Sequence, residues 1–164
     1  MPDIAPDRPD LDGYGPEALA RDYNVSRETL DRLVAFVAAL DKARTGLNLI
    51  GPKERDHLWR RHIADSVQLF ALVPERARTW VDFGSGAGFP GLMIAAFLAD
   101  RESSDIVLVE SAGKKAAFLR AAIEEMDVPA RVWPDRAEAL SPYKVDGISA
   151  RAFAPLPRLL DHVK

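Results

Sequence analysis

The chain has 164 residues, about half of them apolar, a net charge of −3 and no cysteine, which suits one cytoplasmic domain with a small appendage. The missing cysteines exclude disulfides, thiolate metal sites and cysteine nucleophiles, and no other metal site is evident. No apolar run approaches the roughly 20 residues that span a bilayer, and the acidic, proline-rich start is unlike a cationic signal peptide, so no membrane association is expected.

The charge is unevenly distributed along the chain. Residues 1–22 have a net charge of −4, whereas residues 42–61 have a net charge of +4. A local basic patch is what a phosphate backbone requires, whatever the total charge. A solvated helical face would have the same composition, so both interpretations stay open.

The first half of the chain predicts helices. Residues 1–15 are expected to be a flexible acidic tail, and residues 16–75 a helical cap. Pro16 starts a short helix, and Ser26 is a suitable N-cap for a longer one that ends at Gly46. Apolar residues at spacings of three and four give this second helix one apolar stripe: Leu30, Leu33, Val34, Val37 and Leu40.

After the cap the pattern changes. From Pro52 a further helix is expected to run to about Val73, with a break near Ala64 and Asp65. Residues 76–164 then alternate short apolar runs with helical patterns, which indicates parallel βαβ units and a ligand crevice at the carboxyl ends of the strands. Apolar runs without alternation fit strands that are covered on both faces. The expected strands are 80–83, 106–109, 130–133 and 147–150, and the expected helices are 92–98 and 116–126.

The expected fold class is α/β: a Rossmann-like, doubly wound, mostly parallel sheet with an N-terminal helical cap. Such a sheet has about six strands, and the sequence ends soon after the fourth. We therefore expect C-terminal strands to be missing, and the fourth strand to be an open edge unless further chain or a partner covers it.

The turn after the first strand carries the strongest functional signal. Gly84, Gly86, Gly88 and Gly91 lie within eight residues, and residues 86–91 match G-x-G-x-x-G between a strand and a helix. Glu110 closes the second strand 24 residues after Gly86, where an acidic side chain binds ribose hydroxyls. The combination favours an adenosine-containing cofactor over a purely structural turn.

The motif alone does not separate NAD from S-adenosylmethionine. Asp82, two residues before the first glycine, suits a methionine ammonium group or an ordered glycine loop. A carboxylate there would repel the pyrophosphate of NAD. Alternatively, Asp82 only caps the amides of the loop, and its residue type does not distinguish these roles.

Several segments occur in an order that resembles one family. They are residues 47–49, 61–66, the glycine turn, 110–120, 136–138 and 149–152. Together they resemble the bacterial ribosomal RNA small-subunit methyltransferase G family, also called the glucose-inhibited division protein B family. The resemblance runs from about residue 30 to the end of the chain. It implies a class I methyltransferase that uses S-adenosylmethionine to methylate N7 of a guanine in the decoding region of 16S ribosomal RNA.

The resemblance also implies residue roles. Cofactor contacts would come from Gly84, Phe89, Glu110, Ala137, Glu138 and Arg151, with Ala137 and Glu138 beside the adenine and Glu110 on the ribose. No general base is expected, because guanine N7 has a lone pair and no proton to lose, so positioning and desolvation suffice. Arg151 could orient the base or the cofactor carboxylate. The early end of the chain puts RNA docking in doubt more than cofactor binding.

Lys114 and Lys115 are the first candidate RNA contacts. They lie in the first turn of a helix that Ser111 is expected to cap, where cations oppose the helix dipole. Such a placement favours an anionic partner such as an RNA phosphate. Two solvated lysines are the plainer alternative.

Arg60 and Arg61 are the second candidate RNA contacts, on an edge of the helical cap. His62 could belong to the same edge, but a hydrogen bond to Asp65, one turn further on, is the favoured role. The partner would be 16S ribosomal RNA or the 30S subunit, and the protein is expected to act as a monomer. Two rivals are an NAD-dependent oxidoreductase with the same fingerprint, and a truncated module that binds cofactor or RNA without turnover.

Overall fold

A parallel sheet forms the centre of the protein. The computed structural model describes residues 5–51, 53–140 and 144–151. In these ranges the sheet has four strands in the order β3-β2-β1-β4, all parallel, so the chain reverses its direction of winding between β1 and β4. The strands are β1 (Thr79–Phe83), β2 (Asp105–Val109), β3 (Ala130–Trp133) and β4 (Gly147–Ala150), which confirms the expected α/β class and four expected strands.

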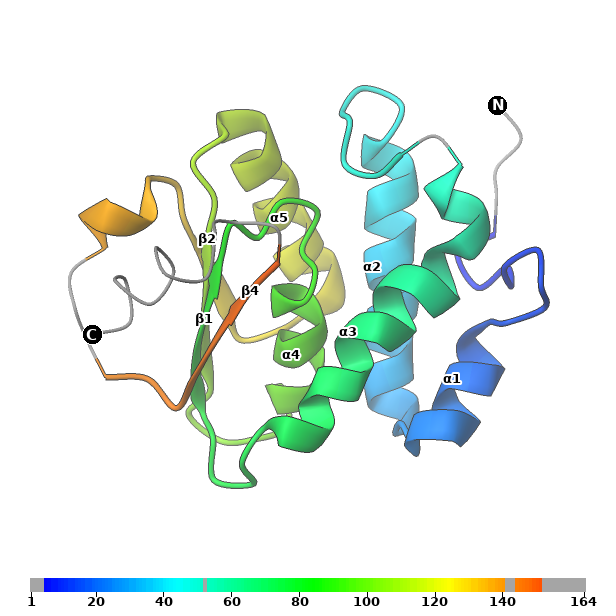
Figure 1. Ribbon diagram of the computed structural model, residues 1–164, viewed down its shortest axis with the longest axis horizontal. Coiled ribbons are helices and arrows are strands. Elements are labelled where there is room, and N and C mark those ends of the chain that lie inside the picture. The colour runs from blue at the N-terminus through cyan, green and yellow to red at the C-terminus, as the bar shows by residue number, and fades with distance from the viewer. Residues whose placement is uncertain (1–4, 52, 141–143, 152–164) are drawn as a thin grey trace.

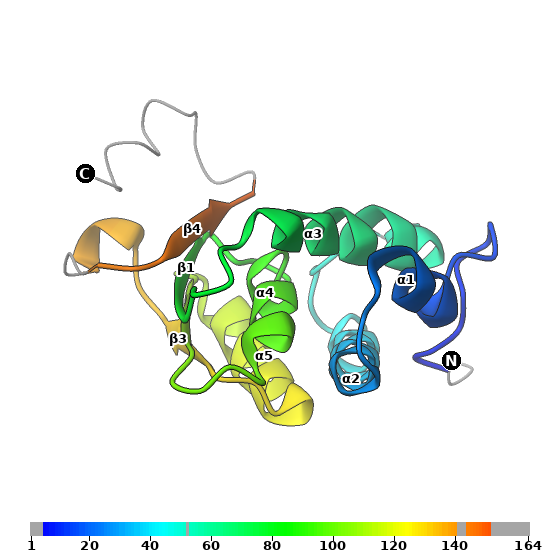
Figure 2. The ribbon, with the colours of Figure 1, turned by 90° about the horizontal axis from the view of Figure 1, so that it is seen from below.

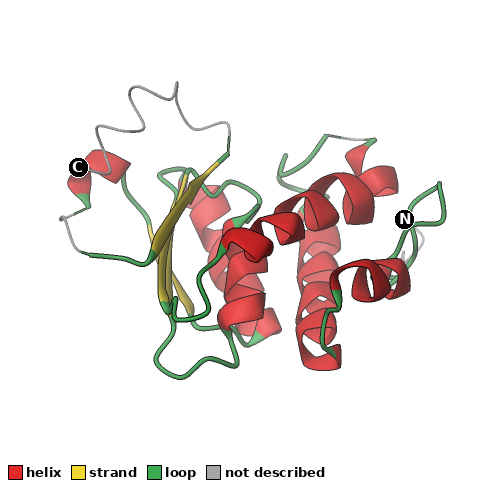
Figure 3. Cartoon of the chain, turned by 60° about the horizontal axis from the view of Figure 1, so that its bottom comes forward, coloured by secondary structure: helices red, strands yellow, loops and turns green. Residues whose placement is uncertain are grey.

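Helices α4 (Gly91–Leu98) and α5 (Gly113–Met126) cover one face of the sheet (Figures 1 and 3). Successive strand side chains point to opposite faces. Trp80, Ile106 and Leu108 therefore pack with α4 and α5, whereas a second apolar cluster on the other face contains Val81, Phe83, Val107, Val109 and Ala137. The two central strands are buried on both faces, as their unbroken apolar runs predicted.

The helical cap packs on the outer side of these helices. Its first two helices are α1 (Pro16–Tyr23) and α2 (Arg27–Ala43), and α2 lies against α5 and α4. Ser26 caps α2 as predicted, because its hydroxyl accepts a hydrogen bond from the Thr29 amide at 3.1 Å. Phe36 joins the cap to the sheet domain through an edge-on contact with Phe89, 5.2 Å between ring centroids. No helix in the described ranges is both long and apolar enough to cross a membrane.

The rest of the cap is one helical segment that changes its hydrogen-bonding pattern along its length. Its parts are the 3₁₀ turn η1 (Glu54–His57), the π-helical turn η2 (Trp59–Ala64), α3 (Asp65–Val67) and the 3₁₀ turn η3 (Gln68–Leu72). The change from π to α falls between Ala64 and Asp65, where the break was expected. Figure 2 shows this segment running alongside α4. Pro52, the expected start, lies outside the described residues.

Residues 5–15 differ from the flexible tail expected over 1–15, because they pack against this segment. Asp10 is buried, and its carboxylate accepts hydrogen bonds from the amides of Trp59 at 3.1 Å and Arg60 at 2.8 Å. Tyr14 is also buried. The proline and glycine content suggested a tail, but a carboxylate that satisfies the free amides of a helical turn holds the segment in place.

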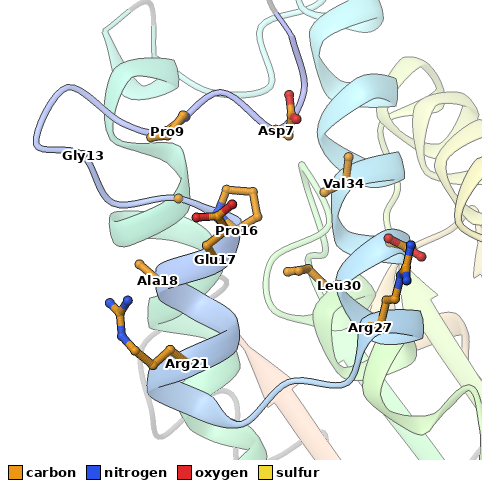
Figure 4. A pocket seen from close by; sticks show the side chains of 12 residues that line it. Asp7, Pro9, Gly13, Pro16, Glu17, Ala18, Arg21, Arg27, Leu30 and Val34 are labelled. Carbon is orange, nitrogen blue, oxygen red and sulfur yellow. The ribbon is translucent and has the colours of Figure 1, made fainter.

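A hollow of about 860 Å³ separates this N-terminal segment from α2. Figure 4 shows that Pro9, Pro16 and Glu17 line one side, and that Leu30 and Val34 of α2 line the other. None of its lining residues belongs to the glycine turn or to a strand. The hollow is therefore separate from the crevice that the sequence predicted.

Candidate functional site

The glycine turn lies at the carboxyl end of β1, beside the point where the winding of the sheet reverses. Gly84, Gly86 and Gly88 have φ angles of 67°, 55° and 95°, in the left-handed region that favours glycine. Gly91 is needed for a different reason: a Cβ atom there would lie 2.7 Å from the Asp82 Cβ and 2.5 Å from a methyl group of Leu108. The turn therefore brings open backbone to the crevice and packs the start of α4 directly on the sheet.

Glu110 joins the glycine turn to the end of β2. One carboxylate oxygen accepts the Gly86 amide at 3.0 Å, and the other accepts the Ala112 amide at 2.8 Å. The residue is 8% exposed. A carboxylate has about four acceptor positions, so two remain after these amides fix its orientation. The structure thus brings Glu110 and Gly86 together in an arrangement that fits the hydroxyls of a ribose.

Asp82 supports the turn from beneath. Its Oδ1 accepts the Ser149 hydroxyl of β4 at 2.6 Å, and the Ser149 oxygen in turn accepts the Trp80 indole N–H at 3.0 Å. Burial raises the pKa of Asp82 to about 6, although hydrogen bonds from Ser149, Ser85 and the Gly91 amide oppose the shift. With 1% of its surface exposed, Asp82 connects β1 to β4 and the glycine turn. These contacts fit a side chain that supports the glycine loop better than one that binds the ammonium group of a ligand.

Arg151 reaches back from the end of β4 to the glycine turn. Its guanidinium carbon lies 5.5 Å from the centre of the Phe89 ring, and its Nη2 donates a hydrogen bond to His62 Nδ1 at 2.9 Å. Phe89 itself is 5% exposed and packs between the rings of Phe36 and His62. The structure therefore brings two expected cofactor residues together with a residue of the helical cap.

His62 has a different partner from the one expected. Its Nε2 lies 2.8 Å from Glu54 Oε2, while Asp65 instead interacts with Gln68 and with Arg151. Helical spacing pointed to Asp65, but the π-helical turn displaces side chains from α-helical positions. Glu54 is eight residues before His62, and neither the local pattern nor the motif indicated this contact.

Ala137 and Glu138 begin η4 (Ala137–Ala139), the short 3₁₀ turn after β3. Ala137 is 7% exposed and packs in the apolar cluster with Val81 and Phe83, on the face of the sheet opposite α4 and α5. Glu138 is exposed. Their place beside the adenine of a cofactor stays a prediction.

The basic patch at residues 42–61 is mostly neutralised by ion pairs with acidic side chains inside and outside this stretch. Arg60 lies 2.6 Å from Asp12 and over the Tyr14 ring, and Arg61 lies 3.8 Å from Glu54. The other ion pairs in the patch are Lys42–Glu125, Arg44–Asp41 and Arg55–Asp41. Counting charges within residues 42–61 missed the partners outside this stretch, Asp12, Asp41 and Glu125, so the patch presents less positive charge than the sequence suggested.

Lys114 and Lys115 are placed differently. The helix N-cap is Ala112, which offers no side-chain cap, so the expected cap by Ser111 was wrong. Lys114 is exposed and Lys115 half-buried, and within the described ranges neither forms an ion pair. Both follow Glu110 closely in sequence, so two cations stand beside the crevice at the N-terminus of α5.

The groups at the carboxyl ends of the strands are suited to binding and orienting a ligand. It offers open glycine backbone, the fixed Glu110 carboxylate and the Arg151 guanidinium. In the described part of the chain, no group of three His, Asp or Glu residues is placed to hold a metal ion. A cation that pairs with carboxylate or phosphate, and a carboxylate that accepts from hydroxyls, fit a nucleoside-containing ligand.

Comparisons with known proteins show the family of this chain. The family model described as GidB, rRNA small subunit methyltransferase G, matches residues 29–164. Relatives named ribosomal RNA small subunit methyltransferase G include those of Hyphomonas neptunium, 55% identical over 139 residues, and Brucella ovis, 52% identical over 135 residues. These alignments cover 85% and 80% of this chain but 65% and 62% of the relatives, so the chain spans less than two thirds of their length. The chain belongs to the rRNA small subunit methyltransferase G family.

Proposed function

We propose that this chain binds S-adenosylmethionine at the carboxyl ends of β1, β2 and β4 and directs its methyl group to N7 of a guanine in 16S ribosomal RNA. The observation that carries the proposal is the Glu110 carboxylate, fixed by the amides of Gly86 and Ala112 beside a left-handed glycine turn. Family membership favours a methyl donor over NAD.

The cofactor site would be built from the ends of β1, β2 and β4 and the turn that follows β3. The φ angles at Gly84 and Gly86 favour glycine, because a side chain there would be strained. Since glycine has no side chain, the ligand can approach this backbone closely. Glu110 accepts hydrogen bonds from the ribose hydroxyls with its two remaining acceptor positions. Arg151, on the β4 side of the turn, pairs with the carboxylate of the methionine moiety. Ala137 and Glu138 would border the adenine.

The bound sulfonium supplies a methyl group that is already activated. The residues of the chain then have to hold the reactants in line and exclude water. Guanine N7 has an in-plane lone pair and carries no proton, so the proposed reaction needs no general base. This agrees with a site whose charged groups, Glu110 and Arg151, are suited to binding.

Lys114 and Lys115 would contact the RNA backbone. They lie beside the crevice, and the helix dipole opposes their positive charge, so a phosphate would relieve an unfavourable placement. Arg60 and Arg61 are weaker candidates, because Asp12 and Glu54 already pair with them. The proposed partner is 16S ribosomal RNA, free or in the 30S subunit.

The test is methyl transfer to RNA that lacks the modification. The protein would be incubated with isotope-labelled S-adenosylmethionine and either unmethylated 30S particles or free 16S RNA, and the products mapped by mass spectrometry. We expect one labelled N7-methylguanine. Binding of the cofactor without transfer to either RNA would support the rival module without turnover, and stabilisation by NAD alone would support the oxidoreductase.

A matched pair of variants links this activity to the crevice. Glu110→Gln should weaken cofactor affinity on the order of tenfold or more, because it replaces a charged acceptor of ribose hydroxyls and loop amides. Glu102→Gln removes the same charge from an exposed residue before β2 and should change nothing. Equal affinities for the two variants would contradict the proposed role of Glu110.

A further inference from the structure

His62 lies between three groups that come from distant parts of the chain. Its Nδ1 is 2.9 Å from the Arg151 guanidinium, its Nε2 is 2.8 Å from the Glu54 carboxylate, and its ring is 5.3 Å from the Phe89 ring. Only 13% of the His62 side chain is exposed. One imidazole of the helical cap thus contacts both the glycine turn and the end of β4.

The two hydrogen bonds fix the protonation state of this imidazole. A guanidinium only donates, so His62 Nδ1 has to accept from Arg151 through its lone pair. The proton of a neutral ring then sits on Nε2, which donates to Glu54. Glu54 therefore selects the tautomer that can hold Arg151.

The other contacts of Arg151 hold it less closely. Its Nη1 is 3.7 Å from Asp65, whose side chain is 54% exposed, and the contact with the Phe89 face fixes no direction for its N–H groups. The Arg151 side chain remains 40% exposed, with four further N–H donors. Among the contacts with described residues, the hydrogen bond to His62 is the one that sets the orientation of the Arg151 guanidinium.

We propose that His62 is a positioning residue that, with Glu54, holds Arg151 at the glycine turn for the carboxylate of the methyl donor, and does so only while its imidazole is neutral. The inference rests on the proposed function, because it takes the ligand of Arg151 from there. It adds that a hydrogen bond from the helical cap orients a residue of the cofactor site.

Protonation of His62 abolishes that hydrogen bond. An imidazolium has N–H on both nitrogens, so Nδ1 would face the Arg151 donors with a donor of its own. The charged groups around it act in both directions: the carboxylates of Glu54 and Asp65 favour the extra proton, and the guanidiniums of Arg151 and Arg61 oppose it. His57, near Glu54, and the buried Asp82, near Arg151, are the other titratable neighbours. The hydrogen bond from Arg151 is therefore available only to the neutral His62 ring.

The first experiment needs no cofactor. Nitrogen-15 NMR of the histidine rings, with His62 assigned by its absence in His62→Asn, reports the tautomer and the titration of each ring. We expect the Nε2–H tautomer at pH 8, and a shift of the His62 titration in Arg151→Ala. A ring protonated on Nδ1 at pH 8, or a titration that is unaltered in Arg151→Ala, overturns the inference.

The second experiment measures S-adenosylmethionine affinity between pH 5.5 and 8. The parent should lose on the order of tenfold in affinity at the acidic end, as should the control His57→Asn. His62→Asn keeps an acceptor near the Nδ1 position that cannot be protonated, so its affinity should not show this acidic loss. His62→Ala should bind weakly throughout. The same acidic loss in His62→Asn as in the parent contradicts the positioning role.

These two experiments separate the failure of the inference from that of the proposed function. If neither the parent nor any variant binds S-adenosylmethionine, the proposed function fails, while the ring tautomer still decides whether His62 holds Arg151. If His62→Ala does not fold, His62→Asn and Arg151→Ala decide the question.

Discussion

The glycine-turn region and the helical cap are held together in different ways. Around the turn, strand pairing and hydrogen bonds between the ends of neighbouring strands, such as Gly86 to Glu110, fix the geometry. The cap depends on charged groups that are far apart in sequence: Asp10 binds the amides of Trp59 and Arg60, and Asp41 pairs with the buried Arg55. The cofactor crevice thus follows from the pairing of regular strands, whereas its connection to the cap depends on individual side-chain contacts.

The largest expected loss of stability comes from a substitution in the helical cap. Asp41→Ala removes the carboxylate that pairs with Arg55, whose side chain is 3% exposed, with Nε–oxygen distances of 2.9 and 3.0 Å. An uncompensated buried guanidinium should cost about 3–5 kcal/mol of unfolding free energy in a denaturant titration. Asp100→Ala, which breaks the more exposed pair with Arg32, should cost about 1 kcal/mol or less. Similar losses would show that the Asp41 pair is no more important than a surface pair.

The second prediction concerns a substitution that disturbs the packing of the sheet beneath the crevice. A Cβ atom on Gly147 would overlap the Trp80 ring, so Gly147→Ala should cost about 3 kcal/mol through displacement of the indole. Gly46→Ala is the matched control, because a Cβ there meets no atom within 4 Å. Thermal unfolding of both variants tests this, and a Gly147→Ala variant as stable as the control would contradict the packing.

Asp82 gives a pH-dependent prediction for the same region. Burial raises its folded-state pKa to about 6 from an unfolded value of 3.8. Its contribution to stability is therefore fully present below pH 3.8 and is lost as the pH rises through 6. Asp82→Asn has no carboxyl to ionise, so its stability should not show this loss. Between pH 4 and 7, the unfolding free energy of the variant should therefore rise relative to that of the parent by about 2–3 kcal/mol. Parallel pH profiles for the two proteins would exclude a raised pKa.

The smallest expected effect concerns the N-terminal segment. Asp10→Ala removes the acceptor of two amides and should cost about 1–2 kcal/mol, and it should make residues 5–15 more susceptible to proteolysis. Asp7→Ala, at an exposed position in the same segment, should leave both properties unchanged. A segment that is cleaved equally fast in the parent and in Asp10→Ala would support the flexible tail that composition suggested.

The same contrast explains what the sequence could predict. Each strand starts within one residue of its expected position, and the glycine turn was correctly placed before α4, because hydrophobic periodicity and glycine act locally. The spacing of Glu110 also anticipated its place beside Gly86.

Contacts between distant residues were not predictable. Asp10 with Trp59, Arg151 with His62 and Lys42 with Glu125 are 49, 89 and 83 residues apart, and no periodic pattern encodes them. The Ser111 cap failed for a different reason. The carboxylate of Glu110 takes the Ala112 amide, and the helix begins one residue later, without a side-chain cap.

The central claim is that the Glu110 carboxylate and the glycine-turn backbone hold S-adenosylmethionine. Amide NMR of the folded protein during titration with the cofactor tests this directly at Gly84, Gly86 and Ala112. The account predicts saturable shifts at these three amides, with a single dissociation constant. A folded sample whose crevice amides do not respond to the cofactor would contradict it.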